Sequence, residues 1–140
     1  MNQVIQTIKQ RRSCRDFKSD MLPDDVIQQI CEAGTFAPTG MNRQSPIIIA
    51  VKDKDLRDKL SIMNAQIMGK ENFDPFYNAP VILIVLADKT APTYLYDGSL
   101  VMQNLMLANL FEVLKLDYES LHMYQTKYPR MLDLQYEQFH

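Results

Sequence analysis

The segment from residue 98 to about residue 115 constrains the fold most strongly, because apolar side chains would surround it on nearly every side when it coils as a helix. Its apolar residues include Leu100, Val101, Leu105, Met106, Ala108 and Leu110. A helix that is hydrophobic all round is usually buried. We therefore expect this helix, which follows Asp97 and Gly98, to be central to the core.

Three further helices are predicted from the spacing of apolar residues. The first covers residues 2–10. The second begins at Pro23, where a proline and two acidic residues suit a first turn. It ends near Gly34 or continues toward Phe36, before Pro38 stops it. The third covers residues 53–70 and carries apolar residues on one face. These residues are Leu56, Leu60, Met63 and Ile67.

Two short apolar runs, residues 47–51 and 81–86, have the length and the β-branched content of strands. Continuous runs of this kind are typical of strands that are buried on both faces. Together with the helices they give the order helix, helix, strand, helix, strand, helix. This order predicts an α+β fold in which helices wrap a small mixed sheet.

The composition limits the class of protein. With 140 residues, 46% of them hydrophobic and 23% charged, the chain is expected to form a single domain over residues 1–140. A net charge of −2 disfavours general nucleic-acid binding, which needs an extended basic surface. The longest apolar run, residues 81–87, is too short to span a bilayer. The N-terminus has no apolar signal region, so we expect a cytoplasmic protein.

The two cysteines and two histidines do not predict a metal site. Cys14 and Cys31 lack metal-binding spacing, and His122 and His140 are far apart. Cys31 falls on an apolar helix face and is expected to be a small core residue. Cys14 lies next to arginines, which favour a thiolate, but we assign it no catalytic role.

A basic stretch near the N-terminus contains three guanidinium groups and a hydroxyl within five residues. They belong to Arg11, Arg12, Ser13 and Arg15. Guanidinium groups bind phosphate through paired hydrogen bonds, and a hydroxyl can fill a remaining acceptor site. One basic loop in an acidic chain therefore favours a small anion as ligand. The alternative is a solvated basic turn.

A second polar stretch, residues 37–46, is bounded by prolines and contains a glycine, so it is predicted to be a loop. Thr39, Asn42 and Gln44 give it a hydroxyl and two amides. Such groups can hydrogen-bond a polar heterocycle. The alternative is an ordinary solvated connection.

These stretches resemble motifs of the nitroreductase family of FMN-dependent oxidoreductases. Arg11-Arg12-Ser13-x-Arg15-x-Phe17 resembles the N-terminal phosphate motif of the family. Ala37-Pro38-Thr39-Gly40-x-Asn42-Arg43-Gln44 resembles its second motif. Asp97-Gly98-Ser99, followed by Gln103-Asn104-Leu105, is similar to its central helix. The resemblance covers about the first 110 residues.

The resemblance implies a nitroreductase-like α+β fold and a homodimer with FMN at the subunit interface. Arg11 and Ser13 would hold the FMN phosphate, with Arg12 nearby, and Arg15 would reach the N1/C2 edge of the flavin. The second motif would approach the ring and the ribityl chain from the partner subunit through Pro38, Thr39 and Asn42, with Gln44 as a weaker candidate.

The chemistry that the resemblance implies belongs to the flavin. Hydride would pass from NAD(P)H to a nitroaromatic, quinone or similar acceptor, and no protein side chain is expected to act as a catalytic acid. The resemblance stops after about residue 110, so residues 111–140 are expected to be a divergent tail in a truncated or altered family member. The alternatives are an FMN-binding or dimeric remnant without turnover, or a remnant without ligand.

Overall fold

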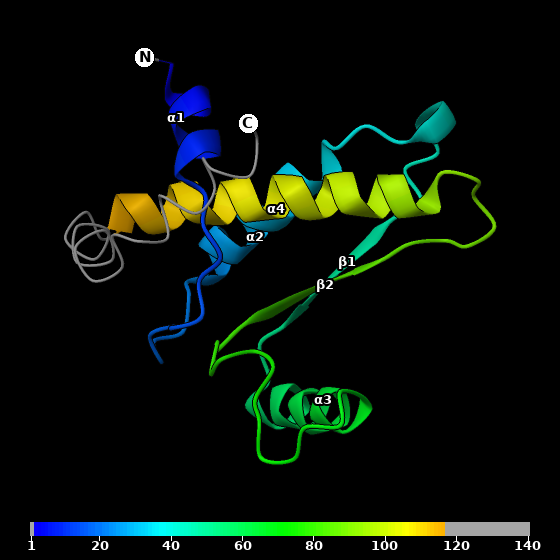
Figure 1. The fold of residues 1–140 in the computed structure, drawn as a ribbon. Coiled ribbons are helices and arrows are strands. Elements are labelled where there is room, and N and C mark those ends of the chain that lie inside the picture. The colour runs from blue at the N-terminus through cyan, green and yellow to red at the C-terminus, as the bar shows by residue number, and fades with distance from the viewer. Residues whose placement is uncertain (1, 117–140) are drawn as a thin grey trace, which may run out of the picture.

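The structure, a computed structural model, describes residues 2–116, and Figure 1 shows the arrangement of its elements. The elements in chain order are α1 (Gln3–Gln10), α2 (Asp24–Thr35), the 3₁₀ turn η1 (Gly40–Asn42), β1 (Ile47–Val51), α3 (Lys54–Ile67), β2 (Ile82–Leu86) and α4 (Tyr94–Leu116). The predicted α+β class and order are confirmed. Most of the expected divergent tail, namely residues 117–140, lies outside the described residues.

Helix α4 contributes Val101 and Leu105 to the core cluster, as predicted, but it is not buried all round, because Leu100 is 42% exposed. It packs along α2 through a cluster that contains Ile30, Ala37, Val101 and Leu105, each at most 5% exposed. The two helices approach closely at Gly34, where an added Cβ would lie 2.7 Å from a methyl carbon of Leu105. A glycine at this position therefore allows the contact that organises the core.

Helix α4 begins at Tyr94, one turn earlier than the predicted start at residue 98. Asp97 lies in the first turn rather than before it, and its backbone N–H donates to the Thr93 carbonyl at 2.9 Å. A carboxylate in the first turn is favoured by the helix dipole. The Asp97-Gly98 pair therefore continues the helix instead of opening it.

The two strands form an antiparallel ribbon in which Ile47 pairs with Leu86 and Val51 pairs with Ile82. One face of the ribbon packs on the helical core through Ile48 and Val85. The expectation that both faces are buried is wrong, because Ile47 is 59% exposed and Leu86 is 49% exposed. A ribbon of two strands that packs one face on helices leaves its other face open.

Helix α3 lies at the far end of the ribbon from α4 (Figure 1). The apolar face that the sequence suggested is largely exposed: Leu56 by 48%, Met63 by 57% and Ile67 by 81%. The buried side of α3 consists instead of Arg57, Ser61 and Ala65. Apolar spacing did not identify the buried face, because α3 buries Arg57 and Ser61 against the Asp74 carboxylate of the loop at residues 73–79.

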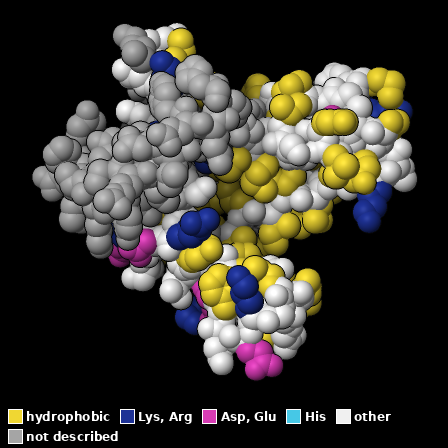
Figure 2. Space-filling view, viewed as in Figure 1, with side chains coloured by type: hydrophobic (Ala, Val, Ile, Leu, Met, Phe, Trp, Pro, Cys, Tyr) yellow, Lys and Arg dark blue, Asp and Glu magenta, His cyan; other side chains and the backbone are white. Residues whose placement is uncertain are grey.

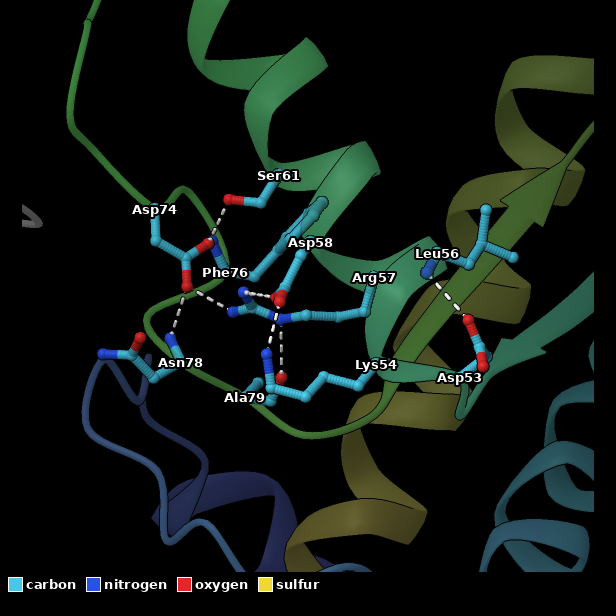
Figure 3. Close-up of polar contacts among 10 residues, drawn as sticks. All are labelled: Asp53, Lys54, Leu56, Arg57, Asp58, Ser61, Asp74, Phe76, Asn78 and Ala79. Carbon is cyan, nitrogen blue, oxygen red and sulfur yellow. Dashed lines mark hydrogen bonds and ion pairs between the residues drawn. The ribbon is translucent and has the colours of Figure 1, made fainter.

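That loop is held by one carboxylate, Asp74 (Figure 3). The Asp74 carboxylate accepts hydrogen bonds from the Arg57 guanidinium and from the Ser61 hydroxyl, the latter at 2.6 Å. It also accepts from the backbone N–H groups of Phe76 at 3.0 Å and Asn78 at 2.7 Å. We call Arg57, Ser61 and Asp74 the Asp74 clamp, because they join α3 to residues 73–79.

The clamp is completed by Arg57, which is only 8% exposed and whose Nε donates to the Ala79 carbonyl at 3.1 Å. Burial raises the pKa of Asp74, but the hydrogen bonds from Ser61, Arg57 and the two backbone N–H groups outweigh it and hold the pKa well below its usual range. The carboxylate is therefore charged at neutral pH.

No helix among the described residues is both long enough and apolar enough to cross a membrane.

We expect Asp74→Asn to lower the free energy of unfolding by about 1–3 kcal/mol at neutral pH, because it weakens a charge-assisted network on a mostly buried arginine. Since the folded pKa of Asp74 is depressed, its contribution is full above the unfolded pKa of about 3.9 and is lost as the pH falls toward the folded value. Urea unfolding at several pH values measures both effects.

The matched control is Asp55→Asn, which removes a carboxylate from the exposed first turn of the same helix. Its effect should stay within about 0.5 kcal/mol. Equal losses for the two variants, or a loss for Asp74→Asn that does not shrink below pH 4, would contradict the role given to the clamp.

Candidate functional site

The basic stretch lies in the irregular segment between α1 and α2, and its side chains point to different partners. Arg11 is half-buried, whereas Arg12, Ser13 and Arg15 are exposed. One terminal nitrogen of Arg12 donates to the carbonyls of Lys9 and Arg11, both at 2.8 Å, and so satisfies the C-terminal end of α1. Arg12 is therefore engaged with the backbone.

Arg15 is held differently. Its guanidinium carbon lies 6.0 Å from the centre of the Tyr77 ring, a cation–π arrangement. The exposed Ser13 hydroxyl lies in the same segment, between Arg11 and Arg15. Unlike Arg12, the guanidinium groups of Arg11 and Arg15 do not bond to the end of α1. Together with the Ser13 hydroxyl they provide the donors that a phosphate group requires.

The second predicted stretch forms a tight loop after α2. Gln44 donates its backbone N–H to the Thr39 hydroxyl at 2.9 Å, which closes the loop on itself. Met41, Asn42 and Gln44 have positive φ angles of 55°, 54° and 48°. Side chains other than glycine rarely adopt this region, and each such residue costs on the order of 1–3 kcal/mol. The loop is therefore strained and requires support from the rest of the structure.

The support comes from the first turn of α4. The Asp97 side chain is 2% exposed, and its carboxylate accepts from the Gly40 N–H at 3.0 Å and from the Thr93 hydroxyl at 2.9 Å. A Cβ on Gly40 would overlap the Thr93 side chain, so only glycine fits this approach. Asp97 thus fixes the loop that carries Pro38, Thr39, Asn42 and Gln44.

Sequence reasoning missed this role of Asp97. Both Asp97 and Gly40 lie in stretches that the sequence singled out, but 57 positions separate them. No local pattern connects them. The one hint in the sequence was that Asp97 places a carboxylate next to a largely apolar helical segment.

An open groove of about 590 Å³ runs between α2 and this loop. Thr39 and Gln44 line it, as do Cys31, Thr35, Ile48 and Val101. Cys31 is only half-buried and lies outside the core cluster, so it is not the core residue that the sequence predicted, although partial burial raises the pKa of its thiol. Pro38 and Asn42 are exposed on the loop. The groove offers hydroxyl and amide groups beside an apolar floor, a suitable surface for a planar heterocycle.

The structure does not bring the two stretches together within one chain. The basic segment precedes α2 and the strained loop follows it, and α2 is 12 residues long. At a rise of 1.5 Å per residue this helix is about 18 Å long, and residues 16–23 lie between the basic stretch and its first residue. Figure 1 shows them on opposite sides of the molecule. Among the described residues, no group of three or more side chains could hold a metal ion.

Comparison with known proteins identifies one family for most of the chain. The family model described as the nitroreductase family matches residues 8–117. A curated relative, the FMN reductase (NAD(P)H) of Bacillus subtilis, is 33% identical over 88 residues, which cover 63% of this chain and 33% of the relative. The chain spans from about one third to about six tenths of the first curated relatives it matches.

Two solved structures are also similar. A nitroreductase with bound FMN from Desulfitobacterium hafniense has a TM-score of 0.70 and 31% identity, over 79% of this chain and 65% of that chain. A nitroreductase with bound FMN from Bacteroides fragilis has a TM-score of 0.74 over 91% of this chain and 80% of that chain. Its identity of 24% supports the likeness of fold alone.

We expect Asp97→Ala to lower the free energy of unfolding by about 1–3 kcal/mol and to speed amide exchange at Gly40, because a buried N–H loses its acceptor. Asp97→Asn keeps an oxygen for Gly40 and a donor for the Thr93 hydroxyl, so it should cost less than about 1 kcal/mol. Hydrogen exchange followed by NMR checks both variants. Fast exchange of Gly40 in the native protein would show that the bond does not hold the loop.

Proposed function

Because the chain belongs to the nitroreductase family, we propose that it binds FMN and acts as an NAD(P)H-dependent oxidoreductase. The observation that carries the proposal is the family match over residues 8–117, which spans the basic stretch, the strained loop and α4 together. The likeness to a structure described as a nitroreductase with bound FMN, at 31% identity, supports the choice of cofactor.

The side chains present fit FMN by their chemistry. Arg11 and Ser13 would hold the phosphate, because a guanidinium and a hydroxyl supply charged and neutral donors. Arg12, whose guanidinium donates to carbonyls at the end of α1, would add positive charge nearby. Arg15 would meet the N1/C2 edge of the flavin, where a cation favours the reduced form.

The loop would supply the remaining contacts. Thr39 and Gln44 line the groove beside α2, and Pro38 and Asn42 are exposed next to them. The hydrogen bond from Gly40 to Asp97 means that the backbone that carries these side chains is held in place before a ligand arrives. Preorganisation of this kind lowers the entropic cost of binding.

When bound, FMN would supply the redox chemistry by accepting a hydride from NAD(P)H and passing it to an acceptor such as a nitroaromatic or a quinone. The protein's own residues would bind the phosphate, orient the ring and place positive charge at its edge. None of the proposed contacts is a general acid, so the pH dependence of turnover should not report a catalytic side chain of this set.

We infer further that two copies of the chain build each site. The basic segment and the strained loop lie on opposite sides of the molecule (Figure 1), so the loop that completes a site would come from a partner. Large apolar side chains are also exposed on α4, where Leu100 and Met106 are 42% and 39% exposed. Figure 2 shows apolar side chains gathered between α3 and α4. A self-complementary dimer would cover such a surface.

A second candidate is an FMN-binding dimer without useful turnover. It is favoured by the open groove and by the exposure of Pro38 and Asn42, which leave the proposed ring contacts open to solvent in a single chain. Loose positioning costs rate more than affinity. FMN retention and NAD(P)H oxidation therefore have to be measured separately.

The first test is the visible spectrum of the purified protein after FMN is added and the excess is removed. We expect a retained flavin band. We expect Arg11→Ala to raise the dissociation constant of FMN by about 10- to 100-fold through loss of a charge-assisted hydrogen bond. Lys59→Ala, which removes an exposed cation from α3, is the control and should change it less than about 2-fold. A native protein that retains no FMN would refute the proposal.

Light scattering tests the dimer. We expect the native chain to be dimeric at micromolar concentration, and Met106→Glu to produce a monomer that also loses FMN, because a charge would be buried in the contact. Gln29→Glu places the same charge on an exposed position of α2 and should leave the dimer intact. A monomeric native protein that still binds FMN would show that one chain suffices.

A further inference from the structure

The loop of residues 70–80 contains none of the proposed flavin contacts, yet the Asp74 clamp fixes it firmly to α3. The clamp encloses one residue in particular. Phe76 and Asn78, whose N–H groups bond to the Asp74 carboxylate, are the two neighbours of Tyr77 in the chain. The Tyr77 N–H itself donates to the Asp74 carbonyl at 3.1 Å. The backbone of Tyr77 is therefore held on both sides.

The conformation of Tyr77 also depends on this support. Its φ angle is 51° and that of Asn78 is 60°. A bulky aromatic residue with positive φ is unusual, and such a conformation persists only where surrounding contacts enforce it. The hydrogen bonds to Asp74 are contacts of this kind. Without them, we expect the loop to relax and the ring to move.

The Tyr77 ring has neighbours that fix its orientation. Phe73 packs against it edge to face, with the ring centres 5.8 Å apart and the planes at 87°. The Arg15 guanidinium lies over the ring at 6.0 Å. Figure 3 shows the N-terminal segment passing beside the clamped loop. The tyrosine thus connects the clamp to the basic stretch.

Arg15 has particular need of such a contact. It is exposed, in a segment without helix or strand, and the side-chain hydrogen bonds of Arg12 and Cys14 within the described residues reach only nearby backbone. A long side chain in this setting samples many rotamers. A fixed aromatic face restricts it, since guanidinium groups stack on aromatic rings.

We propose that the Asp74 clamp positions Arg15 through the ring of Tyr77, which makes Tyr77 and Asp74 positioning residues for the flavin edge. The proposal rests on the proposed function, because Arg15 is the residue assigned to that edge. It also gives α3 a role, because the buried Arg57 and Ser61 of this helix hold Asp74 and so would help to position Arg15.

The first experiment requires no flavin. In NMR spectra of the full chain, we expect the side-chain protons of Arg15 to be shifted upfield by the Tyr77 ring current, relative to those of Arg43, another exposed arginine. Tyr77→Phe keeps the ring and should keep the shift, whereas Tyr77→Leu should abolish it. An Arg15 shift that is the same in all three proteins would overturn the proposal, whether or not FMN binds.

The clamp is tested by leaving the ring in place and weakening its support. Asp74→Asn should reduce the Arg15 shift although Tyr77 is unchanged. If that variant does not fold, Ser61→Ala removes a single hydrogen bond from the clamp and should reduce the shift partially. A folded variant of either kind with the native Arg15 shift would show that the clamp does not position Arg15.

The second experiment uses the FMN-loaded protein. We expect Tyr77→Leu to raise the dissociation constant of FMN by about 2- to 30-fold, the range that corresponds to a cation–π contact, and to lower the reduction potential of the bound flavin. Tyr77→Phe should leave both values near those of the native protein. Native FMN binding with an unchanged potential in Tyr77→Leu would overturn the positioning role while leaving the proposed function intact.

Discussion

The close packing of α2 against α4 is the contact on which the rest of the structure depends. Gly34 allows this close approach, since an added Cβ would lie 2.7 Å from methyl carbons of Leu105 and Ile48, which would have to move. Once the two helices are in contact, the C-terminal end of α2 sets where the strained loop begins, and the first turn of α4 meets that loop at Gly40. Core packing and site geometry therefore follow from the same helix pair.

The part of the molecule around α3 is stabilised by different forces. The α2–α4 core is apolar, whereas α3 buries Arg57 and Ser61 against the carboxylate of Asp74. Apolar burial depends little on pH, but a hydrogen-bonded carboxylate contributes only while it is charged. We therefore expect the core and the α3 region to respond differently to acid.

The proposed flavin site combines two kinds of support. The loop is strained locally and is held by a buried carboxylate, Asp97, so its geometry is set by the core. The basic segment is exposed, and Arg15 contacts the rest of the chain through Tyr77. In the proposed site, the loop is held by a buried hydrogen bond, whereas the basic segment depends on the stacking of Arg15 on Tyr77. Because these two parts lie on opposite sides of the molecule, a second copy of the chain would be the natural means of joining them.

The sequence by itself determined the order of helices and strands, the contribution of α4 to the core, the α+β class and the family, since these depend on local periodicity and on short motifs. It did not determine the buried face of α3, the open face of the ribbon, or the bonds from Asp97 to Gly40 and from Arg57 to Asp74. Local spacing assumes that apolar residues face inward, and α3 breaks that assumption because it turns Arg57 and Ser61 toward the Asp74 carboxylate. The hydrogen bonds join residues far apart in the chain, so only the tertiary structure could decide which donors and acceptors meet.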